Sequence, residues 1–381
     1  MKFEKISNLY SLLIVCLFAF IAISCKDSSS PTAPQNKTLN AENIAKLQEV
    51  ADKIMMQWTI PGMLAYIAVE GEGEYYISRG VGNLATNEPM NINNYFRIAS
   101  VTKTFTTETV LILADEGKID LSKTIGFYLP DYSLPGKDTI TIRMLGNMTS
   151  GLIDFLNDPV LEATYYNSQG TAKFTPEQLI ASVLNSNLLF TPGTHYSYCN
   201  TNTVLLGMVI KKVTGKEVKD VFAEKIFQPL GLTHTFWPET NYLPYPYHHG
   251  YTNLLGPPNT DVTYYGNSWG NSAGILISNL ADLKIWAKEL SEMKLLSASS
   301  KLERRKAGTS EAPYGFGLDL YGNLVGHAGV IVGYNSMVYS DAARKITIIT
   351  HVNSIDENPA GFAFVEFSKI LGYDLSAYEK K

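Results

Sequence analysis

The spacing of apolar residues predicts a helix and two strands near the start of the chain. Between residues 40 and 58, apolar side chains recur at helical spacing behind Asn40, a residue type that often begins a helix. Two apolar runs, residues 63–69 and 75–81, follow on either side of a segment rich in Gly and Glu. Such a pattern is typical of a β-hairpin. We therefore expect an N-terminal helix followed by two antiparallel strands.

The C-terminal part returns to the same pattern. Residues 315–325, 331–339 and 345–352 are rich in β-branched and aromatic side chains and are predicted to be strands. Residues 359–371 have the length and apolar spacing of a closing helix. The simplest packing places strands from both ends of the chain in one antiparallel sheet, which the two terminal helices cover.

The middle of the chain, from residue 119 to about residue 300, has the pattern of helices joined by long loops. The segment Thr175-Pro-Glu-Gln178 is a capping box that predicts a helix through residue 184, and residues 203–213 predict another. Residues 242–258, rich in Tyr, Pro and His, are expected to form a loop.

These elements predict an α/β (α+β) fold with two lobes. The sheet lobe takes residues of about 40–99 and 301–372, and a mostly helical lobe of about 100–300 is inserted between them. Residues 373–381 form a short tail. In such an arrangement we expect the functional site between the lobes.

Composition and charge exclude some classes of function. The 381 residues are 45% hydrophobic and 18% charged with a net charge of −5, which is typical of a globular domain and argues against a nucleic-acid partner. The chain has no internal repeat and no phosphate-binding glycine loop. His248 and His249 are adjacent, which is poor geometry for joint metal ligation, so we predict neither a metal nor a cofactor.

The first 24 residues have the features of a signal peptide. Lys2 and Lys5 precede an apolar run, residues 12–23, that is too short to span a bilayer comfortably. The following Ile-Ser-Cys25 resembles a bacterial lipobox, in which Cys25 becomes lipidated. Ordinary secretory cleavage and an uncleaved anchor are the alternatives. With residues 25–39 as a flexible tether, we predict a membrane-anchored lipoprotein on the periplasmic or cell-surface side of the envelope.

Cysteine usage leaves the mature domain without an internal disulfide. Of the three cysteines, Cys16 lies in the apolar run and Cys25 in the lipobox, so the domain keeps Cys199 alone. Its stability must therefore come from the core.

The segment Phe96-Arg-Ile-Ala-Ser-Val-Thr-Lys103 is the strongest candidate for chemistry. Ser100 and Lys103 are three residues apart at a predicted helix start, so they share one face. A desolvated lysine can lose its proton near neutral pH and activate a serine hydroxyl. The threonines that follow are poor helix formers, and we expect burial to override them. Ser291-Glu-Met-Lys294 has the same spacing, but it lies in a predicted amphipathic surface helix without chemistry.

Two further triplets offer groups that a Ser–Lys pair needs. Tyr198-Cys-Asn200 supplies an amide and a phenol, and a neighbouring ammonium would lower the pKa of that phenol. His327-Ala-Gly329 supplies an imidazole and a small, open stretch of strand beside which a substrate could lie.

Together these motifs resemble those of the serine β-lactamase and penicillin-binding protein superfamily, in the branch of class C β-lactamases and D,D-carboxypeptidases. Supporting stretches are Met148-Thr-Ser-Gly-Leu152 and Gly326-His-Ala-Gly329, and the resemblance covers residues 42–372. The resemblance implies that Ser100 is the nucleophile, that Lys103 is its base, and that Tyr198 is the acid and base for the leaving group. It also implies that the backbone N–H groups of Ser100 and Val330 form the oxyanion hole. The residues that it places at the substrate are Asn200, His327 and Gly329.

The sequence also departs from the family pattern. The third motif begins with His327, where class C β-lactamases carry Lys, and Met148 stands where many members have His. Cys199 replaces a small Ser. Residues 315–327 contain no Lys or Arg that could bind a substrate carboxylate, so this role would fall to a His327 protonated near pH 6.

The resulting prediction is an envelope serine hydrolase that acts through an acyl-enzyme. The function expected first is that of a D,D-carboxypeptidase on peptidoglycan-type peptides. An esterase or a β-lactamase of the same fold is the alternative. A catalytically inactive penicillin-binding or sensor domain is the alternative outside enzyme function. The expected partners are a small peptide or ester substrate and, through the lipid anchor, the membrane.

Overall fold

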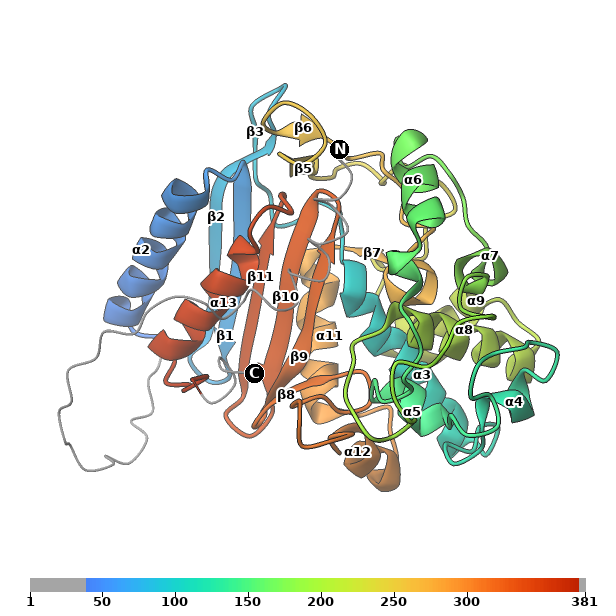
Figure 1. Cartoon of the computed structure of the whole chain (residues 1–381). Coiled ribbons are helices and arrows are strands. Elements are labelled where there is room, and N and C mark those ends of the chain that lie inside the picture. The colour runs from blue at the N-terminus through green and yellow to red at the C-terminus, as the bar shows by residue number, and fades with distance from the viewer. Residues whose placement is uncertain (1–38, 377–381) are drawn as a thin grey trace.

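The structure is a computed structural model that describes residues 39–376 (Figure 1). The predicted signal peptide, Cys25 and nearly all of the tether lie outside the described residues, as does the end of the tail. None of the helices in the described part combines the length and the apolar character needed to cross a membrane.

A seven-stranded antiparallel sheet brings the two ends of the chain together, as predicted. Its order is β3 (Glu88–Pro89), β2 (Gly73–Asn83), β1 (Gly62–Val69), β11 (Ile346–Val352), β10 (Tyr334–Asp341), β9 (Leu324–Ile331) and β8 (Asp319–Tyr321). At its centre β1 pairs with β11, with Met63 opposite Val352 and Val69 opposite Ile346. The N-terminal hairpin and the C-terminal strands therefore form one continuous layer.

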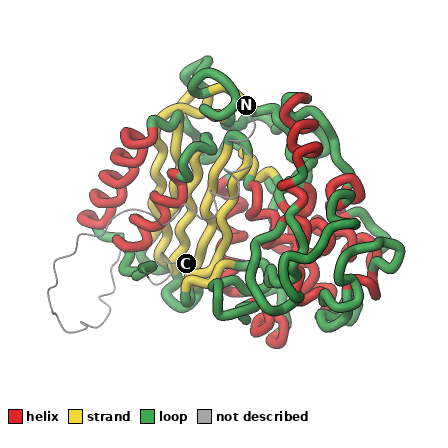
Figure 2. The backbone as a smooth tube through the Cα atoms, viewed as in Figure 1, coloured by secondary structure: helices red, strands yellow, loops and turns green. Residues whose placement is uncertain are grey.

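The two faces of the sheet have different covers (Figure 2). Met63, Ala65 and Ile67 of β1 pack with the terminal helices α2 (Ala41–Trp58) and α13 (Pro359–Ile370). The intervening Tyr66 and Ala68 belong to the core shared with the helical lobe. This period of two is what a strand buried on both faces requires.

The helical lobe lies on one side of the sheet in Figure 1. Its helices are α3 (Thr102–Asp115), α4 (Ile125–Tyr128), α5 (Ile142–Gly146), α6 (Pro159–Asn167), α7 (Pro176–Ile180), α8 (Asn200–Thr214), α9 (Val218–Phe222), the π-helix η4 (Ala223–Phe227) and α10 (Gln228–Leu230). Then come α11 (Leu280–Glu292), which packs against β9, β10 and β11, and α12 (Ala298–Arg304).

Short elements join these helices. They are the 3-10 turns η2 (Ala99–Val101), η3 (Phe155–Asn157) and η5 (Asn271–Ala273), and the strand pairs β4 (Phe96–Arg97) with β7 (Ile277–Ser278) and β5 (Tyr251–Thr252) with β6 (Thr260–Asp261).

Helix α3 forms in spite of its threonines because it is buried. Thr104 donates a hydrogen bond to the carbonyl of Val101 at 2.6 Å, and Thr107 donates to that of Lys103 at 2.9 Å. Both hydroxyls thereby avoid the cost of an unpaired polar group in the core. The expectation that burial overrides helix propensity is confirmed.

Several predicted boundaries were wrong. Residues 315–325 are not one strand, because Gly322, at φ 66°, makes a turn between β8 and β9. His327, which lies between the predicted strands 315–325 and 331–339, consequently falls inside β9. The capping box at Thr175 is present, but α7 ends at Ile180 and not at residue 184. Turns follow from residue 181 onward.

Candidate active site

Ser100 lies where the sheet meets the helical lobe. It is in the turn η2, which connects β4 to α3 and packs against β9. A Cβ atom on Gly329 of β9 would come within 2.2 Å of the carbonyl oxygen of Ile98. Glycine is therefore what lets β9 approach the serine turn so closely. Ser100 itself remains partly exposed, so a substrate can reach it.

The predicted Ser–Lys pair is formed. Lys103 Nζ lies 2.8 Å from Ser100 Oγ and donates a hydrogen bond to the carbonyl of Ala273, also at 2.8 Å. Lys103 is 0% exposed. Its environment lowers its pKa to about 7, chiefly by burial, with Asp154 and Cys199 acting in the opposite direction. Near neutral pH a substantial fraction of Lys103 is therefore a free amine.

The edge of β9 offers a second backbone donor beside the serine. Strand β8 pairs with β9 only as far as Gly326, so this edge is unpaired by strands beyond that point in the described part of the chain. The N–H of Ala328 lies on the side of β8, since it acts on the carboxylate of Asp319 and lowers the pKa of that group against the larger effect of burial. Donors repeat every second residue on one edge of a strand, so the N–H of Val330 points the same way.

Tyr198 faces the Ser–Lys pair, but its predicted acidity was wrong. Its ring centroid is 4.9 Å from Lys103 Nζ. Loss of solvent around the phenol raises its pKa well above the ordinary value, and a hydrogen bond with Ser100 offsets only part of this. Tyr198 is therefore a protonated phenol, suited to donate a proton and not to act as a phenolate base.

His327 is buried and neutral, contrary to the expectation that it becomes a cation near pH 6. Burial, and then the charge of Lys103, lower its pKa to about 3. Its Nδ1–H donates to the carbonyl of Ala328 at 2.5 Å. Its Nε2 then accepts from the hydroxyl of Tyr314 at 3.1 Å. Sequence reasoning missed Tyr314, which lies in a loop with no motif to mark it.

Asp154 is a second residue that sequence reasoning missed. It caps η3, and its carboxylate accepts hydrogen bonds from both the backbone and the side chain of Asn200. The only available signal was its place just after the Thr149-Ser-Gly-Leu152 turn.

The second Ser-x-x-Lys segment lies at the end of α11 and just beyond it, but Ser291 is buried and not on the surface as expected. Ser291 donates hydrogen bonds within its own surroundings, to the carbonyl of Lys288 and the hydroxyl of Ser340, while Lys294 pairs with Glu292. The lysine of this second Ser-x-x-Lys segment therefore turns away from its serine. Cys199 is buried as a free thiol, and burial raises its pKa to about 12.

The adjacent histidines do not form a metal site. His248 stacks in the core on Phe96, whereas His249 pairs with Asp261 at 2.7 Å. Across residues 39–376 no cluster of three or more His, Cys, Asp or Glu side chains could hold a metal ion.

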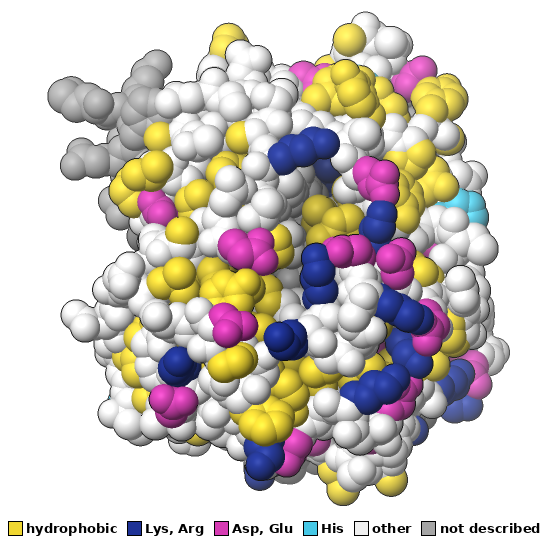
Figure 3. All heavy atoms as spheres, turned by 90° about the vertical axis from the view of Figure 1, so that its right-hand side faces the viewer, with side chains coloured by type: hydrophobic (Ala, Val, Ile, Leu, Met, Phe, Trp, Pro, Cys, Tyr) yellow, Lys and Arg dark blue, Asp and Glu magenta, His cyan; other side chains and the backbone are white. Residues whose placement is uncertain are grey.

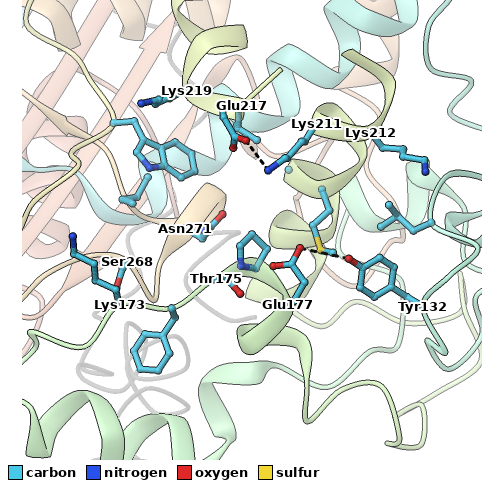
Figure 4. A pocket seen from close by; sticks show the side chains of 18 of the residues that line it. Tyr132, Lys173, Thr175, Glu177, Lys211, Lys212, Glu217, Lys219, Ser268 and Asn271 are labelled. Carbon is cyan, nitrogen blue, oxygen red and sulfur yellow. Dashed lines mark hydrogen bonds and ion pairs between the residues drawn. The ribbon is translucent and has the colours of Figure 1, made fainter. Parts of the chain in front are cut away.

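A cavity of about 740 Å³ lies elsewhere in the helical lobe, between α7, α8 and the segment before α9. Figure 3 shows this face hollowed, with lysines and acidic side chains around apolar groups. In Figure 4 Lys211 points to Glu217, and Tyr132 to Glu177. One wall includes Asn271 of η5, whose last residue, Ala273, accepts the hydrogen bond from Lys103. The cavity does not contain Ser100 or its neighbours.

Comparison with known proteins finds similar curated sequences. The chain is 29% identical to a D-aminopeptidase of Brucella anthropi over 314 residues, which are 77% of this chain and 56% of that protein. It is 27% identical to penicillin-binding protein 4* of Bacillus subtilis (strain 168), over 73% of this chain and 65% of that protein. The chain therefore spans less than two thirds of the length of these relatives.

Among solved structures, a D-stereospecific amidohydrolase from Streptomyces sp. superposes with a TM-score of 0.75 and 29% identity. The match covers 84% of this chain and 98% of that chain. The family model described as Beta-lactamase matches residues 47–363, which include Ser100, Tyr198 and His327. On this match, and on the shared fold, the protein belongs to the Beta-lactamase family.

Proposed function

We propose that the protein is a serine hydrolase that cleaves small amide and ester substrates through an acyl-enzyme on Ser100. The observation that carries the proposal is the buried amine of Lys103, 2.8 Å from the hydroxyl of Ser100. An inactive sensor domain would have no physical need for a lysine whose pKa is lowered to about 7 at this position.

Acylation begins with proton transfer. The neutral amine of Lys103 takes the hydroxyl proton of Ser100 and becomes an ammonium, while Oγ attacks the substrate carbonyl carbon. The negative charge that develops on the carbonyl oxygen is held by the backbone N–H groups of Ser100 and Val330. Both residues are partly exposed, so a substrate can occupy the space beside them.

Collapse of the tetrahedral adduct then expels an amine or an alcohol. Tyr198 donates its hydroxyl proton to this leaving group and recovers a proton from the ammonium of Lys103, whose Nζ lies 4.9 Å from the centroid of the tyrosine ring. The serine proton has thereby reached the leaving group. In deacylation a water molecule attacks the acyl carbon while Tyr198 takes a proton from it and passes its own hydroxyl proton to the neutral amine of Lys103. Lys103 then returns a proton to Ser100 Oγ as the acid leaves.

The charges at the site favour substrates without a carboxylate beside the scissile bond. His327 is neutral, with a pKa of about 3, and Arg304 is buried in an ion pair with Glu108. An unpaired carboxylate would cost free energy on binding. The names of the D-aminopeptidase and the D-stereospecific amidohydrolase support an acyl donor of D configuration, such as a D-amino acid amide.

D,D-carboxypeptidase action is the second candidate, and the similarity to penicillin-binding protein 4* favours it. For this function a cation from outside β9 would have to bind the terminal carboxylate of a peptidoglycan-type peptide. We further propose that the enzyme works in the envelope on a lipid anchor at Cys25, as the lipobox-like Ile-Ser-Cys25 indicates.

Hydrolysis of three substrates tests the proposal: a D-alanine arylamide, a neutral aryl ester and an acetylated D-Ala-D-Ala peptide. We expect kcat/KM for the two substrates that lack a carboxylate to exceed that for the peptide by about tenfold or more, the factor that 1.4 kcal/mol gives. A preference for the peptide would favour the D,D-carboxypeptidase. Absence of hydrolysis together with absence of labelling by a fluorophosphonate would contradict enzyme function altogether.

A further inference from the structure

Asp154 lies beside the catalytic groups proposed above, yet that mechanism gives it no role. One carboxylate oxygen accepts a hydrogen bond from the N–H of Leu156 at 3.0 Å. The other accepts two from Asn200, from the backbone N–H at 2.9 Å and from Nδ2 at 2.7 Å. The carboxylate of Asp154 thus binds both the main chain and the side chain of Asn200, the first residue of α8.

This contact fixes the orientation of the Asn200 amide. An ionised carboxylate can only accept hydrogen bonds, so the group that faces Asp154 must be the NH2 of Asn200 and not its oxygen. Without such a partner the two orientations of an amide are close in energy and in shape. Here the amide oxygen is turned away from Asp154, where it remains as an acceptor for Lys103 or for an N–H of the substrate.

Asp154 is also the anion that faces Lys103. The other titratable groups around this lysine are neutral near pH 7: His327, with a pKa of about 3, Cys199, with a pKa of about 12, and the protonated phenol of Tyr198. Burial raises the pKa of Asp154, and the three N–H groups that it accepts, together with the charge of Lys103, act in the opposite direction and favour the ionised carboxylate. Its charge raises the pKa of Lys103 against the larger effect of burial.

We propose that Asp154 is a positioning residue: it orients the Asn200 amide and supplies the negative charge that stabilises the Lys103 ammonium formed when Ser100 loses its proton. The inference rests on the proposed function, since it takes Lys103 as the proton acceptor. Asp154 itself undergoes no covalent change and exchanges no proton with the substrate.

The local fold does not depend on Asp154 alone, which makes it testable. Thr201 Oγ1 donates to the carbonyl of Ile153 at 2.8 Å and accepts from the N–H of Phe155 at 3.0 Å. These bonds join the same two segments of chain. We therefore expect the nearly isosteric Asp154→Asn variant to fold.

The experiment measures kcat/KM against pH with a neutral aryl ester. In Asp154→Asn we expect the plateau to fall about 10- to 100-fold, the loss expected for one hydrogen bond to a charged group. We also expect the midpoint of the acidic limb to move to lower pH, because Lys103 loses the charge that raises its pKa. A purely structural defect would lower the plateau and leave the midpoint unchanged.

Asp158→Asn is the matched control. Asp158 lies four residues further along and also caps a short helix, accepting from the N–H groups of Val160 and Leu161 at 2.8 and 3.4 Å. We expect this variant to keep both the plateau and the midpoint of the wild type. Asp154→Glu retains the charge but displaces it by one methylene, so it should lower the plateau while its midpoint stays near the wild-type value.

An Asp154→Asn enzyme with the wild-type midpoint would overturn the inference. If Asp154→Asn fails to fold, the Asp154→Glu variant provides the test. A midpoint of its acidic limb that differs from the wild-type value would then overturn the inference. Failure of the proposed function would give a different result: the Ser100→Ala variant, with Asp154 unchanged, would still hydrolyse the ester.

Discussion

Two regions of the helical lobe, the cavity between α7 and α8 and the site around Ser100, hold lysines in opposite states. In the 740 Å³ cavity Lys211 is 58% exposed and pairs with Glu217 at 2.6 Å, and this partner raises its pKa. At Ser100 the side chain of Lys103 is fully buried, and its pKa is lowered to about 7. The cavity neutralises its charges in pairs at the surface, whereas the fold around Ser100 removes solvent from a single amine.

The difference teaches that the environment of a side chain, and not the presence of a cavity beside it, indicates chemistry. A paired surface lysine remains protonated and is a poor base at neutral pH. A desolvated lysine beside a hydroxyl is close to the point where it can exchange a proton. The following variants compare the two regions directly, beginning with the largest expected effect.

Ser100→Ala should abolish covalent labelling by a fluorophosphonate and by a fluorescent penicillin, because it removes the only proposed nucleophile. Ser268→Ala, in the wall of the cavity, should label like the wild type. Gel fluorescence after a fixed labelling time measures both. An adduct that persists in Ser100→Ala would mean that another residue is the nucleophile, and the same experiment on Ser291→Ala would examine the second Ser-x-x-Lys segment.

Lys103→Met should nearly abolish acylation. We expect the acylation rate to fall by about 10⁴-fold, the upper end of the range that general acid–base catalysis contributes. Lys211→Met makes the same substitution in the cavity and should change the acylation rate by less than about twofold, since exposed ion pairs contribute little. Stopped-flow acylation rates give both numbers. Equal effects of the two substitutions would break the distinction between the two lysines.

Tyr198→Phe should lower turnover by about 10²–10⁴-fold while leaving labelling by a fluorophosphonate nearly intact. The phenol stays protonated, and its proposed task is to protonate an amine or alcohol leaving group. A fluoride leaving group needs less help of that kind. Steady-state kcat on an arylamide measures the effect, and an unchanged value would remove the phenol from the mechanism.

The smallest effect concerns His327. Because its pKa is about 3, it stays neutral down to pH 5.5, and acidification supplies no cation for a substrate carboxylate. The ratio of kcat/KM for a D-Ala-D-Ala peptide to that for a neutral ester should therefore be flat from pH 5.5 to pH 8. Protonation of Lys103 slows the hydrolysis of both substrates by the same factor, so this effect cancels in the ratio. A ratio that rises toward pH 6 in the wild type but not in His327→Gln would contradict this.

The fold and the core of the site could be predicted from the sequence because their patterns are local. Runs of apolar and β-branched residues in β1 and β11 specify strands, and Ser100 and Lys103 share a face by helical spacing alone. Asp154 and Tyr314 could not be found in this way. Each acts on a partner far along the chain, Asn200 and His327, and only the folded chain brings them together.

Acidity was the property least accessible from sequence. The neighbouring ammonium suggested a lowered pKa for Tyr198, but loss of solvent dominates and raises it. The same effect moves His327 away from its ordinary pKa. Burial of one side chain depends on packing from several elements at once, so no short motif records it.

The central claim is that Lys103 is the proton acceptor for Ser100, and the pH dependence of acylation tests it most directly. The measurement is kcat/KM from pH 5 to pH 9.5 for a neutral aryl ester, whose own charge does not change. A base works only when deprotonated, so the rate should rise with pH and level off, with a midpoint near the Lys103 pKa of about 7. A rate that is independent of pH over this range, or that still rises tenfold per unit at pH 9, would contradict the account.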